Sequence, residues 1–339
     1  MNEIEQNSNK KEIMDILFQR YARITFTDSS KSDNSPPFLI LETGNIDFNA
    51  TVSYDLSKNS NKAKIDVYNL PVKYEALLKN SNVSIHAGYK LKNSSQEFGH
   101  VFTGVVEKFG SNKNGNTIQT EIFCSEINKI YKDLLFQVSI KSSKNSKNKS
   151  GVKASTIINK IIEKTQKLEP GLTLKTPLTL YHDIEYERSK SFNGNLKNIF
   201  SRIAQDSKSI FIFNGNSQVE FIPYNHNSLE EIYFDYNRVL EILTTDRGFS
   251  ITMIFDHRMK VGKKLKGNKV ENRFIKIFPD STPHIITKVD HSINTSTGTH
   301  TTTLDIDSLY TVLEKERNEK LEERRKKNQE TNKITIDIT

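Results

Sequence analysis

An alternation of apolar and polar residues recurs along the first third of this chain and limits what it can fold into. Residues 62–69 place Ala63, Ile65 and Val67 on one side of an extended segment and polar residues on the other. Residues 82–89 repeat the pattern. Successive side chains of a strand point to opposite faces, so a period of two indicates one buried face and one wet face. This pattern favours antiparallel sheet over a parallel sheet that is covered on both sides.

Turn residues separate several similar runs, and each run is predicted to be a strand. Pro71 suits the first turn of a short helix over residues 71–79, between two of these strands. About seven short strands over roughly 120 residues favour a β-barrel or a sandwich. The remaining predicted strands of the first third are 18–26, 37–42, 46–54, 100–109 and 117–124.

The middle of the chain changes to a helical period. Residues 151–167 and 195–206 carry apolar side chains three and four positions apart, which predicts two amphipathic helices. Residues 209–222 then form a predicted hairpin with Asn214-Gly215 at its tip, a strong short-range hairpin signal. This region therefore reads as a small α+β unit.

Strand patterns return in the last third and are followed by a nearly all-polar helical pattern over residues 309–328. Residues 334–339 form a possible further strand or a disordered end. The predicted strands are 232–235, 239–243, 249–255, 273–278, 285–291 and 299–306.

The predicted fold class is mixed and mainly β (α+β), with two antiparallel β-barrel domains around a small α+β domain. The predicted division is an N-terminal extension over 1–15, a first barrel over 16–138, the α+β domain over 139–225, a second barrel-like domain over 226–307 and a charged helical tail over 308–339.

Composition excludes several other classes. The longest apolar runs are only a few residues, far short of the roughly 20 needed to cross a bilayer, so no membrane segment is expected. The first residues lack the apolar core of a signal peptide. Cys124 is the single cysteine, which excludes a disulfide framework, and its apolar neighbour Phe123 indicates a buried thiol.

The net charge of +8 raises the question of nucleic acid. Most lysines are scattered, as on a solvated surface, while 141–153 reads as a basic loop and 314–327 mixes both signs. A nucleic-acid-binding barrel with Tyr54, Tyr68 and Tyr89 as platforms is a less favoured alternative.

No catalytic, cofactor-binding or metal-binding residue is predicted. The chain has no HExxH, GxSxG or GxxxxGK[ST] pattern. A cell-wall hydrolase therefore remains only an alternative. His86 alternates with Val83, Ile85 and Ala87 and is predicted to face solvent. The candidate ligands or bases are His86, His100, His182, His226, His257, His284, His291 and His300.

Several phrases, in order, resemble the central baseplate hub proteins of phage tails and contractile injection systems. Residues 65–109 carry the phrases of that family's first barrel, and residues 151–164 and 192–223 resemble its helix and its helix-plus-hairpin unit. The resemblance spans about residues 18–306. The residues that carry it are Tyr68, Asn69, Leu70, Ala87, Gly88, Tyr89, Phe102, Gly104, Gly248, Gly262, His291 and Thr302.

The resemblance implies a structural role without catalysis or cofactors. Such hubs are trimers in which each chain supplies two tube-like barrels, and the ring adapts a sixfold tail tube to a threefold spike. The implied partners are copies of the chain itself, tube proteins and spike proteins, with DNA contact only in passage through the lumen. The implied location is the virion tail, after assembly in the host cytoplasm. Another structural or adhesion protein of a tail or cell surface is the alternative.

Overall fold

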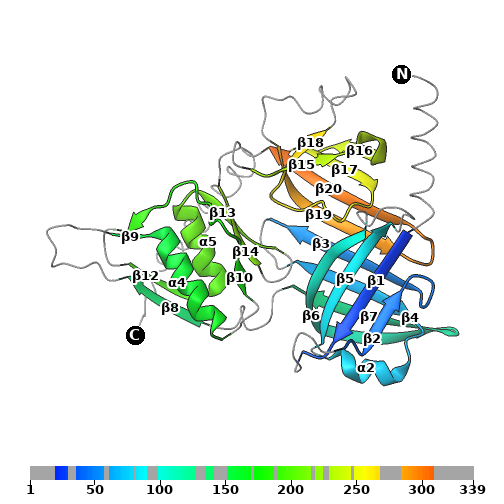
Figure 1. Cartoon of the computed structure of the whole chain (residues 1–339). Helices are drawn as coiled ribbons and strands as arrows, with labels where there is room; N and C mark the ends of the chain where they lie inside the picture. The colour runs from blue at the N-terminus through cyan, green and yellow to red at the C-terminus, as the bar shows by residue number, and fades with distance from the viewer. Residues whose placement is uncertain are drawn as a thin grey trace, which may run out of the picture.

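The computed structural model describes residues 20–29, 36–56, 61–79, 81–89, 98–126, 135–140, 151–168, 172–186, 190–214, 218–223, 229–245, 248–267 and 284–308. Strands make up most of these residues (Figure 1), so the predicted mainly β, α+β class is confirmed. The predicted strand 273–278, helix 309–328 and segment 334–339 lie outside the described residues, as do most of the basic loop and the N-terminal extension.

Thirteen strands form one large sheet, paired antiparallel apart from one short parallel pair, β15 with β18. Two strands lie off the main path: β18 (Lys264–Gly267) pairs with β19 and with β15 (Glu231–Phe234). The path runs β16 (Val239–Thr244), β17 (Gly248–Ile254), β20 (His300–Ser308), β19 (His284–Asn294), β3 (Phe48–Asp55), β4 (Lys62–Tyr68), β7 (Thr117–Ser125), β6 (Phe98–Asn114), β5 (Asn82–Tyr89), β1 (Arg20–Thr27) and β2 (Leu39–Glu42).

The two β-rich parts of the sequence are joined within this sheet by the pairing of β3 with β19. Their alternations match in phase, since Val52 lies opposite His291 and Tyr54 lies opposite Val289, all four buried. The sequence predicted two barrels, whereas no closed barrel forms among the described strands, and β16 and β2 are the ends of the path. Both parts also share one hydrophobic core, because the joined strands present one continuous apolar face.

The loop between β17 and β18, residues 255–263, folds into the interior of the curved sheet. Phe255, Met259 and Val261 are each at most 3% exposed and belong to the main core. Burial of three large apolar side chains stabilises this loop by about 1.5–3 kcal/mol for each fully buried residue. The loop is therefore part of the core and not a surface connection.

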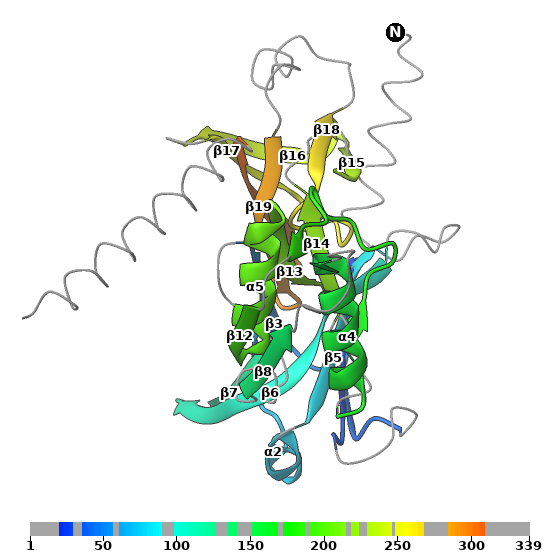
Figure 2. The same ribbon diagram turned by 90° about the vertical axis from the view of Figure 1, so that its left-hand side faces the viewer.

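The inserted α+β unit has a core of its own. Figure 2 views this unit face on, with α4 (Ala154–Gln166) and α5 (Leu196–Asp206) side by side. The sheet β10 (Thr173–Leu174), β14 (Gln218–Pro223), β13 (Ser209–Asn214) contributes to this core, as do residues of β8 (Leu135–Ile140) and β12 (Lys190–Asn195). A further short pair joins β9 (Val152–Lys153) to β11 (Glu185–Tyr186). The sequence predicted both helices and the hairpin but not β8 or β12.

The hairpin β13–β14 connects the inserted unit to the main sheet, because its two faces serve different cores. Ile210, Ile212 and Ile222 pack into the main core, whereas Val219 and Phe221 pack against the helices. Successive side chains of the hairpin strands point to opposite faces, so one face contacts the main core and the other contacts the core of the inserted unit.

A substitution at Gly104 tests how closely the residues of the main sheet pack. A Cβ at this position would lie 2.5 Å from the Ser125 carbonyl oxygen and 2.7 Å from the Phe102 ring. We expect Gly104→Ala to lower the free energy of unfolding by about 1–3 kcal/mol, measured by denaturant titration. Gly110→Ala in the same strand is the control, because no described atom lies within 4 Å of its added Cβ. Equal losses in both variants would contradict the packing.

Candidate functional site

The residues that carried the family resemblance fall into separate structural groups. Tyr68, Asn69 and Leu70 form the exit from β4 into α2 (Val72–Leu78). Asn69 has a positive φ of 55°, which asparagine tolerates better than most residues. Its backbone N–H donates to the Ile118 carbonyl (2.7 Å), and its Oδ1 accepts from the Ile118 N–H (3.0 Å). This turn therefore fixes the start of α2 against β7.

Ala87, Tyr89 and Phe102 are buried on the neighbouring strands β5 and β6, with Gly88 and Gly104 beside them. The three side chains pack in the core, and the two glycines have none. That these residues have a structural role stays a prediction of the resemblance.

Gly248 and Gly262 lie where other backbone or side-chain atoms come close. A Cβ on Gly248 would lie 1.9 Å from the Ile306 carbonyl oxygen. Gly262 has φ +80°, and its added Cβ would lie 2.2 Å from Cδ1 of Ile222. Gly262 therefore allows the 255–263 loop to pass directly under the β13–β14 hairpin of the inserted unit.

The structure brings His291 and Thr302 together in the main core. The Asp256 N–H donates to Thr302 Oγ1 (3.0 Å), and the same oxygen lies 3.0 Å from His291 Nδ1. Since the N–H already points at this oxygen, the Thr302 hydroxyl hydrogen is available to donate to Nδ1. The His291 ring also hydrogen-bonds the backbone of Met259. These contacts assign a neutral ring with its proton on Nε2.

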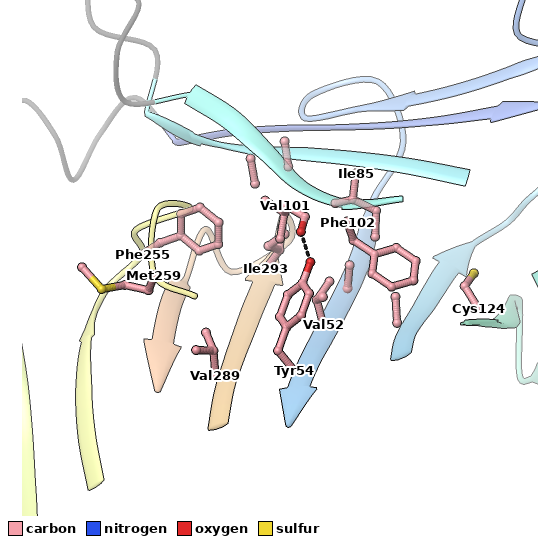
Figure 3. Packing of buried hydrophobic residues seen from close by; sticks show 14 of the residues in the cluster. Val52, Tyr54, Ile85, Val101, Phe102, Cys124, Phe255, Met259, Val289 and Ile293 are labelled. Carbon is pink, nitrogen blue, oxygen red and sulfur yellow. Dashed lines mark hydrogen bonds between the residues drawn. The ribbon is translucent and has the colours of Figure 1, made fainter. Parts of the chain in front are cut away.

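Tyr54 spans the interior of the sheet (Figure 3). Its hydroxyl donates to the carbonyl of Val101, although β3 and β6 are not neighbours in the sheet. The β5–β6 register shifts between Ile85 and His86, so Val101 is the extra residue of a bulge. The Tyr54 hydroxyl thus satisfies a carbonyl that the bulge removes from the ladder. This contact was not predictable from the sequence, because a bulge leaves no mark in the alternation of a single strand.

Glu126 is a buried carboxylic acid at the end of β7. The Asn61 amide donates both to Glu126 Oε2 and to the Phe213 carbonyl of the inserted unit (3.1 Å for the latter). Within the described part of the chain, Glu126 Oε1 has no hydrogen-bond partner. Burial raises the pKa of Glu126 to about 8, against smaller opposing effects of Asn61 and Lys260. The group is therefore largely protonated at neutral pH.

The face of the main sheet opposite the core is polar and built of small side chains. On β3, Ser53 donates to Asp290 (2.5 Å), and on β17 Ser250 donates to Asp305 (2.9 Å). Lys288 lies among these carboxylates, and its hydrogen bond with Asp290 raises its pKa. We call this surface the polar face; its members on four adjacent strands are Thr51, Ser53, Asp55, Ser250, Thr252, Lys288, Asp290, Ser292, Thr301, Thr303, Asp305 and Asp307.

The histidines do not form a metal centre in the described residues, where no group of three or more His, Cys, Asp or Glu side chains could hold an ion. The prediction that His86 faces solvent was wrong: the side chain is half-buried between the Phe98 and His100 rings. Burial lowers the pKa of His100, His291 and His300 to about 4.

Cys124 is buried, as predicted, and burial raises the pKa of its thiol well above the ordinary range. None of the described helices has an apolar stretch long enough to cross a bilayer.

Comparison with solved structures relates this fold to tail proteins. The tail protein from Neisseria meningitidis MC58 is 7% identical with a TM-score of 0.55, over 84% of this chain and 96% of its own. The 43 kDa tail protein of prophage MuSo2 from Shewanella oneidensis is also 7% identical with a TM-score of 0.55, over 85% and 98% of the two chains.

A chain of the Francisella PdpA–VgrG complex, in its half-lidded form, is 10% identical with a TM-score of 0.53, over 91% of this chain and 62% of its own. No family model matches the sequence, and no curated protein matches it. The chain therefore has the fold of phage tail proteins, found through structure alone.

The Tyr54 contact predicts a specific loss of stability. Tyr54→Phe removes the donor and leaves the buried Val101 carbonyl unpaired, which costs about 1–3 kcal/mol. Tyr68→Phe is the matched control. The Tyr68 hydroxyl is half-buried and accepts a hydrogen bond from the Asn49 amide, so its removal leaves no buried carbonyl unpaired. Chemical denaturation should show the larger loss for Tyr54→Phe, and similar values for both would argue against the contact.

Glu126 predicts a loss of stability toward alkaline pH. Its pKa of about 8 lies above the ordinary 4.5, so the folded chain holds a proton that the unfolded chain releases. The stabilisation is complete below about pH 4.5 and disappears as the pH rises through 8, by at most about 5 kcal/mol.

Glu126→Gln should abolish this component, so unfolding free energies of variant and parent should diverge as the pH rises. Glu163→Gln on the exposed surface of α4 should keep the parent's pH profile. Parallel profiles for parent and Glu126→Gln would show that the buried acid does not titrate as described.

Proposed function

We propose that this chain is the structural hub of a phage or phage-derived tail baseplate. The proposal rests on the tail-protein fold together with the order of the family-like phrases along the sequence. In such a hub, three copies of the chain form a ring that adapts a sixfold tail tube to a threefold spike. The assembled ring is located in the virion tail.

The observation that best supports this role is the polar face. Four adjacent strands present short hydroxyl and carboxylate side chains on a continuous surface opposite the core. Asp55, Asp290, Asp305 and Asp307 outnumber Lys288 there, although the whole chain carries +8. A smooth surface of this charge repels phosphate, so DNA would pass it without adhering. We infer that the polar face lines the channel of the ring.

The end strands offer a way to build that ring. Within the described residues, β16 pairs only with β17, and β2 pairs only with β1. Leu240 and Leu243 on β16 are 60% and 53% exposed. An unpaired strand edge with exposed apolar side chains is a template for pairing with another chain. Head-to-tail contacts between different surfaces close into rings when the rotation permits.

In this proposal, the segments 16–138, apart from β8, and 226–307 together supply the ring-forming sheet of each subunit. The segment 139–225 forms an outer α+β unit, to which β8 belongs through its pairing with β12. No residue is assigned a catalytic role and no cofactor is invoked. The neighbours in the assembly would be further copies of this chain, tube proteins and spike proteins.

Mass measurement of the purified chain tests the proposal. We expect a species of three times the 38.9 kDa chain mass and a threefold ring with an open lumen in negative-stain images. Leu240→Lys should weaken this assembly, because it places a charge on the β16 edge. Leu168→Lys, at a 63% exposed position of the inserted unit, should leave it intact. A chain that stays monomeric at its highest soluble concentration would contradict the hub role.

A further inference from the structure

We propose that the 255–263 loop is a latch that holds the inserted α+β unit on the main sheet, and that acid releases it. This inference concerns a conformational device within one chain and goes beyond the proposed function.

The latch fills the interior of the main sheet. Phe255 and Met259 lie beside Val101, Val289 and Ile293 in the core (Figure 3). Backbone hydrogen bonds hold its two ends: the Phe255 N–H donates to the His300 carbonyl (3.3 Å), the Gly262 N–H to the Ile286 carbonyl (2.8 Å), and the Ile286 N–H to the Lys263 carbonyl (2.9 Å). Between these ends, the position of the loop depends on apolar burial and on a small number of side-chain contacts.

One of these contacts is an ionic anchor at Asp256, in which Arg238 lies outside the loop and Arg258 lies within it. The carboxylate is 4% exposed, accepts two hydrogen bonds from the Arg258 guanidinium (2.9 and 2.7 Å) and lies 3.7 Å from the Arg238 guanidinium. Burial opposes the charge, but Arg258 and Arg238 outweigh it and lower the pKa of Asp256. This anchor stays ionised over the whole range in which the histidines titrate.

The second contact is His291, whose ring bonds the Met259 backbone of the loop directly and reaches the Asp256 N–H from Nδ1 through Thr302 of β20. A second proton would have to be placed on Nδ1, against the Thr302 hydroxyl hydrogen, in a fully buried position. Protonation therefore reverses the bond between Nδ1 and Thr302, so that the Thr302 hydroxyl hydrogen loses its acceptor, and it places a charge inside the core.

The charged and titratable groups around His291 come from three elements. The loop contributes Asp256, which favours the charged ring, and His257, which opposes it; β19 contributes Asp290, which favours it. Tyr54 of β3 stacks edge-on against the ring with centroids 6.1 Å apart, and its own hydroxyl stays neutral because burial raises its pKa. Desolvation outweighs the two carboxylates and holds the pKa of His291 at about 4.

Release of the latch would loosen the inserted unit, which the main sheet otherwise holds through Ile210 and Ile212 of the hairpin and the bond from Asn61 to the Phe213 carbonyl. Gly262 passes under Ile222 of β14. Lys263 binds Glu230, which Lys175 also reaches at 3.2 Å, and Lys175 binds Glu220 of β14 at 2.7 Å. A loop that leaves the core withdraws both contacts at once.

The sign of the effect follows from the lowered pKa. The folded chain binds fewer protons than the unfolded chain between about pH 4 and 6.5, so the latch is fully stabilised above 6.5 and loses stability as the pH falls toward 4. His100, near His257 and Lys260 of the loop, and His300, beside Phe255, titrate in the same direction.

A single tryptophan can report this release, because the chain contains none. Phe255→Trp places the reporter in the latch, and its emission is followed together with far-UV circular dichroism from about pH 7.5 to about pH 4. We expect a red shift of the emission that precedes loss of the dichroism. Small-angle scattering should show an increased radius of gyration over the same pH range. Coincident changes of emission and dichroism would overturn the latch, because they would mean global unfolding.

A second variant keeps the test specific. In the Phe255→Trp background, His291→Gln cannot charge but can still accept from Thr302 and donate to Met259. It should lower the pH of the red shift by about half a unit or more. His182→Gln, at an exposed position of the inserted unit, is the control and should leave the midpoint unchanged. An unchanged midpoint in His291→Gln would also overturn the proposal. Tryptophan emission and circular dichroism report on the individual chain, so a chain that stays monomeric tests the latch equally well.

Discussion

The pairing of β3 with β19 is the constraint on which the rest of the structure depends. Ser53 and Asp290 meet across it although 237 positions separate them in sequence. The entropic cost of closing so long a loop grows only with the logarithm of its length, and burial along the paired strands offsets it. One pairing thus converts two β-rich segments into one sheet with one core, and aligns their polar sides into one face.

This arrangement forces polar groups into the core, and several of them are matched to a partner. Tyr54 satisfies the carbonyl freed by the β6 bulge, Thr302 and His291 position the 255–263 loop, and Asn61 links Glu126 to the inserted unit. Buried networks of this kind specify one geometry, because any other arrangement leaves groups unsatisfied. They also make the folded state less stable at both acidic and alkaline pH. Protonation of buried histidines destabilises it in acid, and ionisation of Glu126 destabilises it in alkali.

Alternation in the sequence predicted most strands, both large helices and the hairpin, because each signal is local. The β3–β19 pairing was not predictable, since many strands share the same phase of alternation. β8 and β12 were not predicted from the sequence. They form a separate two-stranded sheet whose apolar residues contribute to the core of the inserted unit. Among the residues singled out by resemblance, only His291 and Thr302 form a direct polar pair. Glu126 and Asp256 carry no sequence mark of their burial, whereas the alternation places Tyr54 on the same face as Val52 but does not show its contact with Val101.

The orientation of the polar face in the assembled particle tests the account most directly. A cryo-EM reconstruction of the purified assembly resolves which sheet surface lines the channel. The account predicts a threefold ring in which β3, β17, β19 and β20 turn Ser53, Asp290, Thr303 and Asp305 toward the lumen. A ring in which these side chains face outward, or are buried between subunits, would contradict it.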